Sequence, residues 1–289
     1  MKFKILIPVY NDWQSISKLL EDINSNVSNL DHEISVIIMN DASNHDREKE
    51  DKNLENIFSV KILNMKTNQG HARCIATGLK YIFQKEDFDY VIPMDGDGED
   101  RPEEIREFIN QIQNSNNKPI VGERIKRSEN LIFKICYQLH KLITLTFTGK
   151  SIKFGNFTCL PKSTVEKLIN DKSTWNSFSG SLAKVEKNLI SVPSIRGIRY
   201  FGPSKMSLYN LIIHSFSIIG VFKYTVLFRS ILICIGLLYF KSSLEIFFFI
   251  LFILIIFFNL IIICVSLREN KKSLMKSEEN LSNIDIINN

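Results

Sequence analysis

The stretch Met94-Asp95-Gly96-Asp97-Gly98-Glu99-Asp100 ends a short apolar run that begins at Tyr90, which we interpret as a buried strand. Its four acidic side chains within six residues repel one another, so the segment is costly to fold unless a cation offsets their charge. Hard cations such as Mg²⁺ or Mn²⁺ prefer oxygen ligands and often complete their shell with substrate phosphates. The two glycines allow a ligand to approach the backbone closely. We therefore favour a metal and diphosphate site at this segment.

Two other interpretations of the acidic segment stay open. A calcium loop uses a similar D-x-D-x-E spacing, but it would need a later glutamate at its twelfth position, which is missing here. The acidic residues could instead cap the helix that follows, and this alone would explain Asp100 and Glu103.

The sequence before and after this segment alternates between short apolar runs and helical patterns, which indicates an α/β fold with a mostly parallel sheet and helices on both faces. The candidate strands are Lys4–Val9, Ile34–Met39, Val60–Asn64, Tyr90–Met94 and Pro119–Gly122. Polar motifs follow the first, second and fourth of these runs. Ligands of such sheets bind beyond the carboxyl ends of the strands, so we expect those motifs to meet at one site.

The next part of the chain predicts three helices and one more extended segment. Asp100-Arg101-Pro102-Glu103 combines a capping side chain, an early proline and acidic residues, which is typical of a helix start. A longer helix is expected from Glu129 to about Phe147, and a further helix near Ser163. Between them we expect an edge segment at Gly155–Leu160.

The C-terminal region is much more apolar than the rest. Leu244–Leu267 is 24 residues long, enough at about 1.5 Å per residue to cross a hydrocarbon core of about 30 Å. Tyr224–Phe240 is shorter and is interpreted as a second span, with a re-entrant or interfacial helix as the alternative. The basic cluster after residue 267 favours a cytoplasmic tail. We thus expect a catalytic domain at 1–206, an amphipathic interfacial helix at 207–223, two transmembrane helices at 224–267 (about 224–240 and 244–267), and a basic, then disordered, cytoplasmic tail at 268–289.

Charge and cysteine content limit the compartment and the partners. The net charge of +5 is modest and is not concentrated on one tail, which argues against a nucleic-acid binder. The five cysteines are irregularly spaced, as expected for free thiols in a reducing compartment. The apolar run that ends at Val9 is too short for a signal peptide, so we expect none. The prediction is a multi-pass protein of the inner (plasma) membrane with its catalytic domain in the cytoplasm.

Four motifs occur in the order and spacing of one known family. They are Pro8-Val9-Tyr10-Asn11-Asp12, Asn40-Asp41-Ala42-Ser43, Asn68-Gln69-Gly70-His71-Ala72-Arg73 and Asp95-Gly96-Asp97. Together they resemble the family-2 glycosyltransferases with a GT-A (Rossmann-like) fold over about residues 3–210. With the C-terminal spans, the chain is similar to the branch that includes dolichyl-phosphate mannose synthases and bacterial polyprenyl-phosphate glycosyltransferases.

The resemblance implies roles for residues around the donor. The residues implied to bind the nucleotide are Pro8, Tyr10, Asp12, Asp41, Arg73 and Asp95. Asp95 and Asp97 match the catalytic D-x-D pair, and with Glu99 they are implied to hold Mg²⁺ or Mn²⁺. Asn40 replaces an acid that is common in the family, so the choice between a uracil and a guanine donor stays open.

Further residues are implied to bind the acceptor and the leaving group. Arg124 matches an arginine that binds the phosphate of the acceptor lipid, with Arg127, Asn156 and Lys134 as helpers, although a solvated helix face explains Arg127 and Lys134 equally well. Residues 196–206 resemble a family loop that precedes the membrane, in which Arg199, Ser204 and Lys205 are implied to bind the donor diphosphate and, for Arg199 and Lys205, to assist catalysis. His71 and His214 have no ligand-spaced partners and are interpreted as packing or exposed residues.

The resemblance thus implies an inverting, metal-dependent transfer of a sugar from a UDP- or GDP-sugar to a membrane lipid carrier, most simply a polyprenyl phosphate. Asn156 stands where many relatives carry an acid that is implied to help deprotonate the acceptor. A phosphate acceptor is already ionised at neutral pH and would not need such a base. A glycan or lipid hydroxyl acceptor is the alternative within the enzyme class. A membrane-tethered scaffold that has lost turnover is the alternative outside it. The sequence also allows a homo-oligomer.

Overall fold

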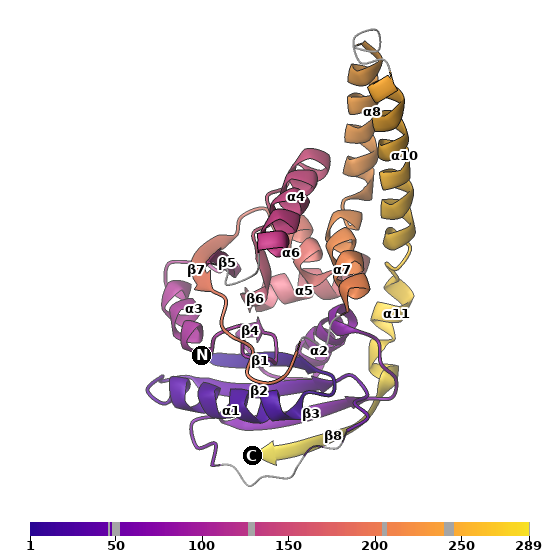
Figure 1. The fold of residues 1–289 in the computed structure, drawn as a ribbon. Helices are drawn as coiled ribbons and strands as arrows, with labels where there is room; N and C mark the ends of the chain where they lie inside the picture. Colours follow the sequence, from indigo (N-terminus) through magenta and orange to yellow (C-terminus); the bar gives the residue numbers. More distant parts are fainter. Residues whose placement is uncertain (46, 48–52, 127–130, 204–206, 240–245, 289) are drawn as a thin grey trace.

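The computed structural model describes residues 1–45, 47, 53–126, 131–203, 207–239 and 246–288, and it contains one eight-stranded sheet (Figure 1). The strand order across the sheet is β7-β5-β6-β4-β1-β2-β3-β8. The strands are β1 (Lys2–Val9), β2 (Glu33–Asn40), β3 (Ser59–Met65), β4 (Tyr90–Pro93), β5 (Ile120–Lys126), β6 (Phe154–Pro161), β7 (Ile190–Ile195) and β8 (Leu281–Asn288).

Parallel pairing dominates the centre of this sheet. β1 pairs in parallel with β2 and β4, and β2 pairs in parallel with β3. β6 runs antiparallel between β4 and β5, so it is an interior strand. The predicted α/β class and the five predicted strands are confirmed, but the interpretation of Gly155–Leu160 as an edge segment was wrong. Phe157, Cys159 and Leu160 are all buried, as an interior strand requires.

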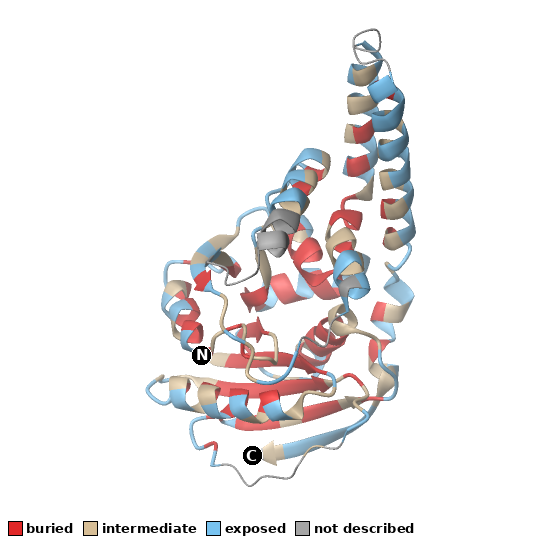
Figure 2. Cartoon of the chain, viewed as in Figure 1, coloured by how far each residue is buried: buried red, intermediate tan, exposed pale blue. Residues whose placement is uncertain are grey.

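Helices cover both faces of the sheet because the central strands are apolar on both sides. Phe3, Ile5 and Ile7 of β1 pack in one core with α1 and α3, whereas Leu6 and β2 residue Met39 pack in a second core with α2, α5 and α6. The helices of the sheet domain are α1 (Trp13–Val27), α2 (His71–Lys85), α3 (Ile105–Ile112), α4 (Leu131–Thr148), α5 (Lys162–Asn170) and α6 (Phe178–Val185), with short 3₁₀ turns η1 (Pro102–Glu104) and η2 (Lys172–Trp175). Figure 2 shows the buried residues concentrated between these layers.

The long helices described after the sheet domain are α7 (Leu208–Gly220), α8 (Lys223–Tyr239) and α10 (Ile246–Ser266). α8 and α10 run side by side away from the sheet, and most of their apolar side chains are exposed (Figures 1 and 2). Among the described residues, one helix, which begins at Ile246, is long and apolar enough to cross a membrane on its own. α7 and α8, bent by 83° to each other, meet the same criteria only as a pair. A second span therefore stays a prediction.

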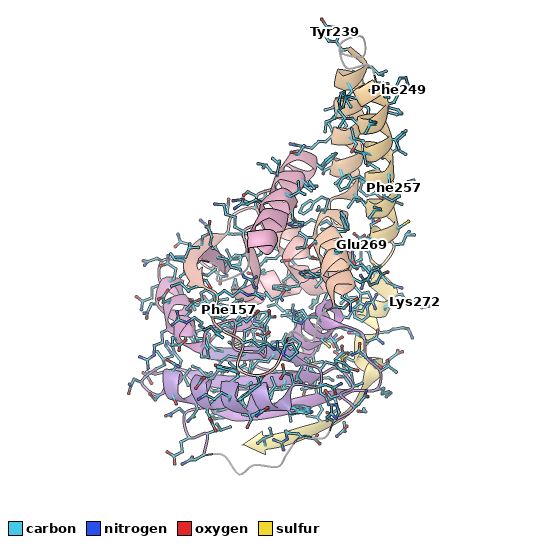
Figure 3. All side chains as sticks on the ribbon, viewed as in Figure 1. Phe157, Tyr239, Phe249, Phe257, Glu269 and Lys272 are labelled. Carbon is cyan, nitrogen blue, oxygen red and sulfur yellow. The ribbon has the colours of Figure 1, made fainter. Side chains whose placement is uncertain are left out.

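The two long helices join the domain at one polar cluster. In Figure 3, Tyr239 lies at the far tip of α8, and Phe249 and Phe257 lie along α10, whereas Glu269 lies beside the domain. The buried Glu269 carboxylate accepts ion pairs from Lys223 at 2.8 Å and from Lys172 at 3.6 Å. The beginning of α8 and the end of α10 are thus fixed to the same side of the domain.

Residues 268–288 of the tail are folded against the domain, whereas a disordered tail was expected there. It forms α11 (Lys271–Met275), η3 (Ser277–Asn280) and β8, which pairs antiparallel with β3. Leu281 packs on one core of the sheet and Ile287 on the other. β3 would otherwise be an open edge, and covering it satisfies its backbone groups. The polar, Asn-rich composition hid this short apolar alternation.

Candidate active site

The acidic segment lies where the carboxyl ends of β1, β2 and β4 meet. β1 ends beside Asn40 of β2, and the segment follows directly after β4. Gly96 is pressed against the end of β1, because an added Cβ would lie 3.2 Å from the carbonyl oxygen of Pro8. The predicted convergence of the polar motifs at this edge of the sheet is confirmed.

Asp95 stands at the buried side of the site with His71 and Asn156. His71 Nε2 lies 3.2 Å from Asp95 Oδ1, and Asn156 Nδ2 donates to the same oxygen at 3.1 Å. Asn156 Nδ2 also lies 2.7 Å from His71 Nε2. His71 is the first residue of α2, so the glycine-containing motif before that helix delivers it to the site. His71 was interpreted as a packing or exposed residue, but it contacts Asp95. Its position in the motif before α2 could have indicated this, whereas its spacing from other histidines could not.

Asp97 is bound by the loop that follows β7. Arg199 Nη1 donates to Asp97 Oδ2 at 2.6 Å, and the other guanidinium nitrogen of Arg199 contacts Asp12 Oδ2. The Tyr200 amide donates to the Asp97 carbonyl at 2.9 Å. One arginine therefore joins the motif after β1 to the motif after β4.

The same loop also contacts Glu99. Arg196 pairs with the Glu99 carboxylate, and the Gly197 amide donates to the Glu99 carbonyl at 2.8 Å. The Tyr200 hydroxyl donates to Asp22 of α1 at 2.6 Å and so anchors the loop over the acidic segment. The roles of Arg196 and Tyr200 were not predicted from the sequence, although both belong to the loop that was.

The residues implied to bind the nucleotide surround the ends of β1 and β2. Both Asp41 carboxylate oxygens accept backbone hydrogen bonds, from Gln69 at 2.7 Å and from Gly70 at 2.8 Å. Asp41 thereby shapes the loop before α2. Arg73 lies over the Trp175 ring at 5.7 Å, Tyr10 is exposed and Pro8 is buried in β1.

Of the residues expected to bind the acceptor, Arg124 and Asn156 lie in the part of the chain that the structure describes. Arg124 lies against Gly155, the residue before Asn156 in β6, since a Cβ added at Gly155 would fall 2.8 Å from Arg124 Nη2. This nitrogen lies 3.9 Å from Asp100 Oδ1. Arg127, Ser204 and Lys205 lie outside the described residues, as does the side chain of Lys134.

The acidic cluster has pKa values that reflect its excess negative charge. Burial, Asp95 and Glu99 together raise the pKa of Asp97 to about 6, and burial with the charge of Asp95 raises the pKa of Asp100 to about 7. Burial opposes ionisation of Asp95, but the hydrogen bond and charge of His71 outweigh it and hold the Asp95 pKa well below its usual range. The positively charged side chains around the cluster therefore do not fully offset its negative charge.

A hard divalent cation fits these oxygen donors if the protein shares it with the substrate. Within the described ranges, no group of three acidic, histidine or cysteine side chains is placed to hold a metal ion. Two aspartates would therefore hold it incompletely, as Mg²⁺ is often held when substrate phosphates complete its shell. Glu99 is already paired with Arg196, so its role as a third ligand stays a prediction.

Gly98 should be essential for closing the loop over the acidic segment. Its φ is +87°, and an added Cβ would lie 2.5 Å from the Tyr200 ring. We expect Gly98→Ala to lower transfer activity at least about tenfold by displacing that ring. The control is Gly202→Ala, which also has a positive φ, of +62°, but no atom within 4 Å of the added Cβ. The left-handed backbone alone costs about 1–2 kcal/mol, so equal activity losses in both variants would exclude the Tyr200 contact as the cause.

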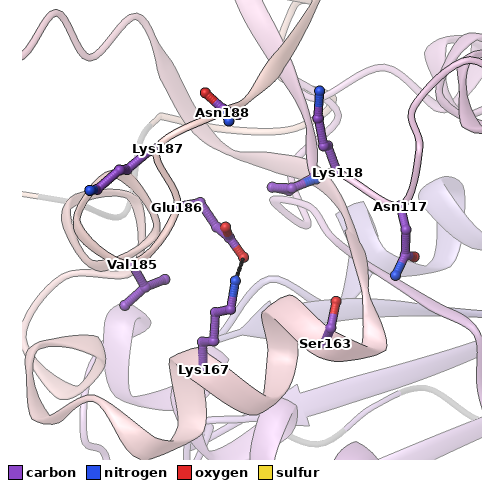
Figure 4. Close-up of a pocket in the computed structure, with 9 residues that line it drawn as sticks. Asn117, Lys118, Ser163, Lys167, Val185, Glu186, Lys187 and Asn188 are labelled. Carbon is purple, nitrogen blue, oxygen red and sulfur yellow. Dashed lines mark hydrogen bonds and ion pairs between the residues drawn. The ribbon is translucent and has the colours of Figure 1, made fainter.

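A separate pocket of about 380 Å³ lies away from this site (Figure 4). Its lining includes Lys118, Ser163 and Lys187, and Lys167 pairs with Glu186 across it at 2.9 Å. These residues precede β5 and begin α5, at the edge of the sheet opposite to the acidic segment. The pocket therefore takes no part in the site described above.

Comparison with known protein families shows which family this chain belongs to. Residues 4–165 match the family described as glycosyl transferase family 2, which is more than half of the chain. The chain belongs to glycosyl transferase family 2. It is a glycosyltransferase by that membership, and the resemblance noted from its four motifs is confirmed.

Curated relatives are similar over the larger part of the chain. The undecaprenyl-phosphate 4-deoxy-4-formamido-L-arabinose transferase of Proteus mirabilis (strain HI4320) is 26% identical over 226 residues, which are 73% of this chain and 64% of that protein. The enzyme of the same description from Klebsiella pneumoniae (strain 342) is 24% identical over 227 residues, again 73% and 64%. The chain thus spans about 64% of the length of these relatives.

Solved structures confirm the GT-A-like fold. Glucosyl-3-phosphoglycerate synthase from Mycobacterium tuberculosis, in complex with Mn²⁺, uridine diphosphate and glucosyl-3-phosphoglycerate, superimposes with a TM-score of 0.55 at 11% identity, over 78% of this chain and 80% of that one. Mannosyl-3-phosphoglycerate synthase from Rubrobacter xylanophilus gives 0.53 at 10% identity, over 76% and 72%.

Proposed function

We propose that this glycosyltransferase moves a sugar, with inversion, from a nucleoside-diphosphate donor to a polyprenyl phosphate at the cytoplasmic face of a membrane, and that it requires Mg²⁺ or Mn²⁺. One observation carries the proposal: Asp97 is bound by Arg199, Asp95 is bound by Asn156, and the neighbouring Asp100 lies 3.9 Å from Arg124. An apolar helix extends from the domain that holds these residues. A donor diphosphate and an anionic acceptor can both be bound by such a site.

The positions of two arginine side chains support the proposed binding of a nucleoside-diphosphate donor. Arg199 and Arg196 reach over the acidic segment, next to the Asp12 loop that is implied to bind the nucleotide. A divalent ion held by Asp95 and Asp97 would neutralise part of the diphosphate charge. Relatives in fold that contain uridine diphosphate and Mn²⁺ agree with this assignment.

The acceptor side is supported by the surroundings of Asn156. Its amide and the His71 imidazole both contact Asp95, and the Arg124 guanidinium adds positive charge 3.9 Å from the neighbouring Asp100. Burial opposes protonation of His71, but Asp95, Asp100 and Asp97 raise its pKa above the usual value. A phosphate oxygen is ionised at neutral pH and needs no base, which suits an asparagine at this position. The relatives named as undecaprenyl-phosphate transferases point to the same acceptor class.

The mechanism we propose is a single displacement. An acceptor phosphate oxygen attacks the anomeric carbon while the bond from that carbon to the diphosphate oxygen breaks, and the nucleoside diphosphate leaves with the electron pair. Arg199 donates hydrogen bonds to the charge that develops on the leaving group. Each well-placed donor of this kind is typically worth about 3 kcal/mol of transition-state stabilisation. Asn156 and Arg124 orient the acceptor for attack from the opposite side.

A hydroxyl acceptor is the second candidate, and the raised pKa values of Asp97 and Asp100 favour it specifically. A carboxylate whose conjugate acid has a pKa of about 6 or 7 can remove a hydroxyl proton near neutral pH. The two candidates differ in the product, a glycosyl phosphate diester or a glycoside.

The test uses membranes that contain the protein, labelled UDP- and GDP-sugars, Mg²⁺ or Mn²⁺, and undecaprenyl phosphate. We expect label in the organic phase, its loss on chelation, and its release by mild acid, because a glycosyl phosphate diester is acid-labile. Acid-stable label in lipid would favour the hydroxyl acceptor instead. Donor consumption without labelled lipid would reject the lipid acceptor, and a protein that binds no donor would support the scaffold alternative.

A further inference from the structure

A chain of hydrogen bonds connects the C-terminal strand to the loops of the donor site. Asn64 Nδ2 on β3 donates to Asp285 Oδ2 on β8 at 2.7 Å, and Asn40 Nδ2 on β2 donates to Asn64 Oδ1 at 2.8 Å. The Ser43 amide then donates to Asn40 Oδ1 at 3.0 Å. We call these four residues the amide relay. It crosses three neighbouring strands at the edge where the donor motifs lie.

The carboxylate at one end sets the direction of the whole relay. An ionised carboxylate only accepts hydrogen bonds, whereas an amide side chain has one donor end and one acceptor end. Asp285 therefore requires Asn64 to present its NH₂ group, which turns the Asn64 carbonyl toward Asn40. Asn40 must in turn donate to Asn64, and its own carbonyl is left to accept from Ser43.

The other end of the relay holds two backbone positions that are rarely adopted. Ala42 and Asn11 have φ values of 56° and 53°, in the left-handed region. Ser43 serves both loops, because its amide binds Asn40 and its Oγ accepts from the Asn11 amide at 2.9 Å. Asp41 and Asp12, the acids implied to bind the nucleotide, adjoin these two residues.

A second contact of the same C-terminal segment reaches the opposite side of Asp41. The Lys66 amide donates to the Asn280 carbonyl at 2.7 Å, and Thr67 Oγ1 donates to Asn280 Oδ1 at 3.1 Å. This linker continues to Gln69 and Gly70, whose amides bind the Asp41 carboxylate. Residues 277–288 thus support Asp41 from both neighbouring segments.

We propose that residues 277–288 are a positioning element of the donor site, in which Asp285 holds the loops of Asp12 and Asp41 through Asn64 and Asn40. The inference rests on the proposed nucleotide donor. It assigns a function to a segment outside residues 4–165, the part that matches the family. It also explains why an asparagine works at position 40, since an acid there would face the Asn64 carbonyl.

The test is a reversal of the relay in the full-length protein. Asn40→Asp places an acceptor against the Asn64 carbonyl, and we expect the KM for donor to rise about tenfold, with kcat and the KM for acceptor within about twofold. Adding Asp285→Asn lets Asn64 turn around, donate to position 40 and accept from position 285. The double variant should therefore recover a KM within about threefold of the wild type.

A second variant avoids the risk that an acid at position 40 unfolds the domain. Asp285 is exposed on β8, so the fold should tolerate Asp285→Lys. A lysine only donates hydrogen bonds, so Asn64 would have to turn its carbonyl toward position 285 and its NH₂ group toward Asn40. We expect about a fivefold rise in the donor KM. Ser282→Ala is the control. It removes a 3.0 Å hydrogen bond from the Ser282 hydroxyl on β8 to the main-chain carbonyl of Asn64 on β3, and it leaves the side chains of the amide relay unchanged. It should leave the donor KM unchanged.

The outcomes separate the relay from the proposed function. A wild-type donor KM in Asn40→Asp and Asp285→Lys, or no recovery in the double variant, would overturn the relay while transfer itself continues. Calorimetric titration of the wild type with UDP and with GDP tests the underlying donor assignment. If neither nucleotide binds, the proposed function fails together with the inference that rests on it.

Discussion

Asp97→Asn should lower sugar transfer at least about 100-fold while the protein remains folded. The Asp97 carboxylate binds Arg199 at 2.6 Å and is one of the two acids that we propose to share a metal with the donor. Asparagine keeps the shape but loses the charge that both cations require. Loss of one preorganised electrostatic contact in an active site typically costs about 3 kcal/mol, which is a factor of 10²–10³.

The same substitution should not lower the melting temperature, which distinguishes a catalytic role from a structural one. Burial with the charges of Asp95 and Glu99 raises the pKa of Asp97 to about 6 from the usual 3.8. For an acid, a raised folded-state pKa means that ionisation opposes folding above that pH and that the cost is relieved as pH falls. A neutral asparagine lacks this cost, so at pH 7.5 the metal-free variant should melt no lower than the wild type.

Glu107→Gln is the matched control for Asp97→Asn. Glu107 is exposed on α3 and outside the site, so its neutralisation should leave transfer within about twofold. Initial rates at saturating donor, followed by label in the organic phase, provide the measurement. Asp97→Asn with more than a tenth of the wild-type rate would remove Asp97 from the proposed machinery.

The sheet and the edge of the site could be predicted because they depend on local patterns. Apolar runs separated by helical periodicity predicted five strands within a few residues of their observed bounds, and β1 and β4 bring their polar ends together by parallel pairing alone. Asp95 and Asp97 follow directly from that geometry, since only a turn separates them from a buried strand.

The features that the sequence hid depend on contacts between distant segments. His71 lies next to Asp95 only because α2 begins at the same edge at which β4 ends. Likewise, β8 pairs with β3 across more than 200 residues of chain, and its mixture of isoleucine with serine, asparagine and aspartate resembles a polar tail. Such pairings are decided by which edge is left open by the rest of the fold, which no local window contains.

Arg199 provides the second large expected effect. It is the one described side chain that touches both Asp12 and Asp97, with its Nε bound to the Phe201 carbonyl at 3.0 Å. Arg199→Ala should lower kcat about 100-fold, because it removes the donor to the leaving group and leaves two partly buried carboxylates with less opposing charge. Arg199→Lys should recover only part of that loss, since an ammonium group cannot bridge two carboxylates as a planar guanidinium does.

The metal dependence of the Arg199 variants would show how the loop works. In the structure Arg199 binds the Asp97 carboxylate, which would also hold the proposed metal, so we expect the two cations to compete for Asp97. Arg199→Ala should therefore reach half-maximal rate at a lower Mn²⁺ concentration than the wild type, even though its kcat is far lower. Lys167→Ala, which breaks an ion pair with Glu186 at the opposite edge of the sheet, is the control and should change neither quantity. If Arg199→Ala instead needed more Mn²⁺, the arginine would be supporting the metal site and not competing for it, and the loop would close only after the metal and donor are in place.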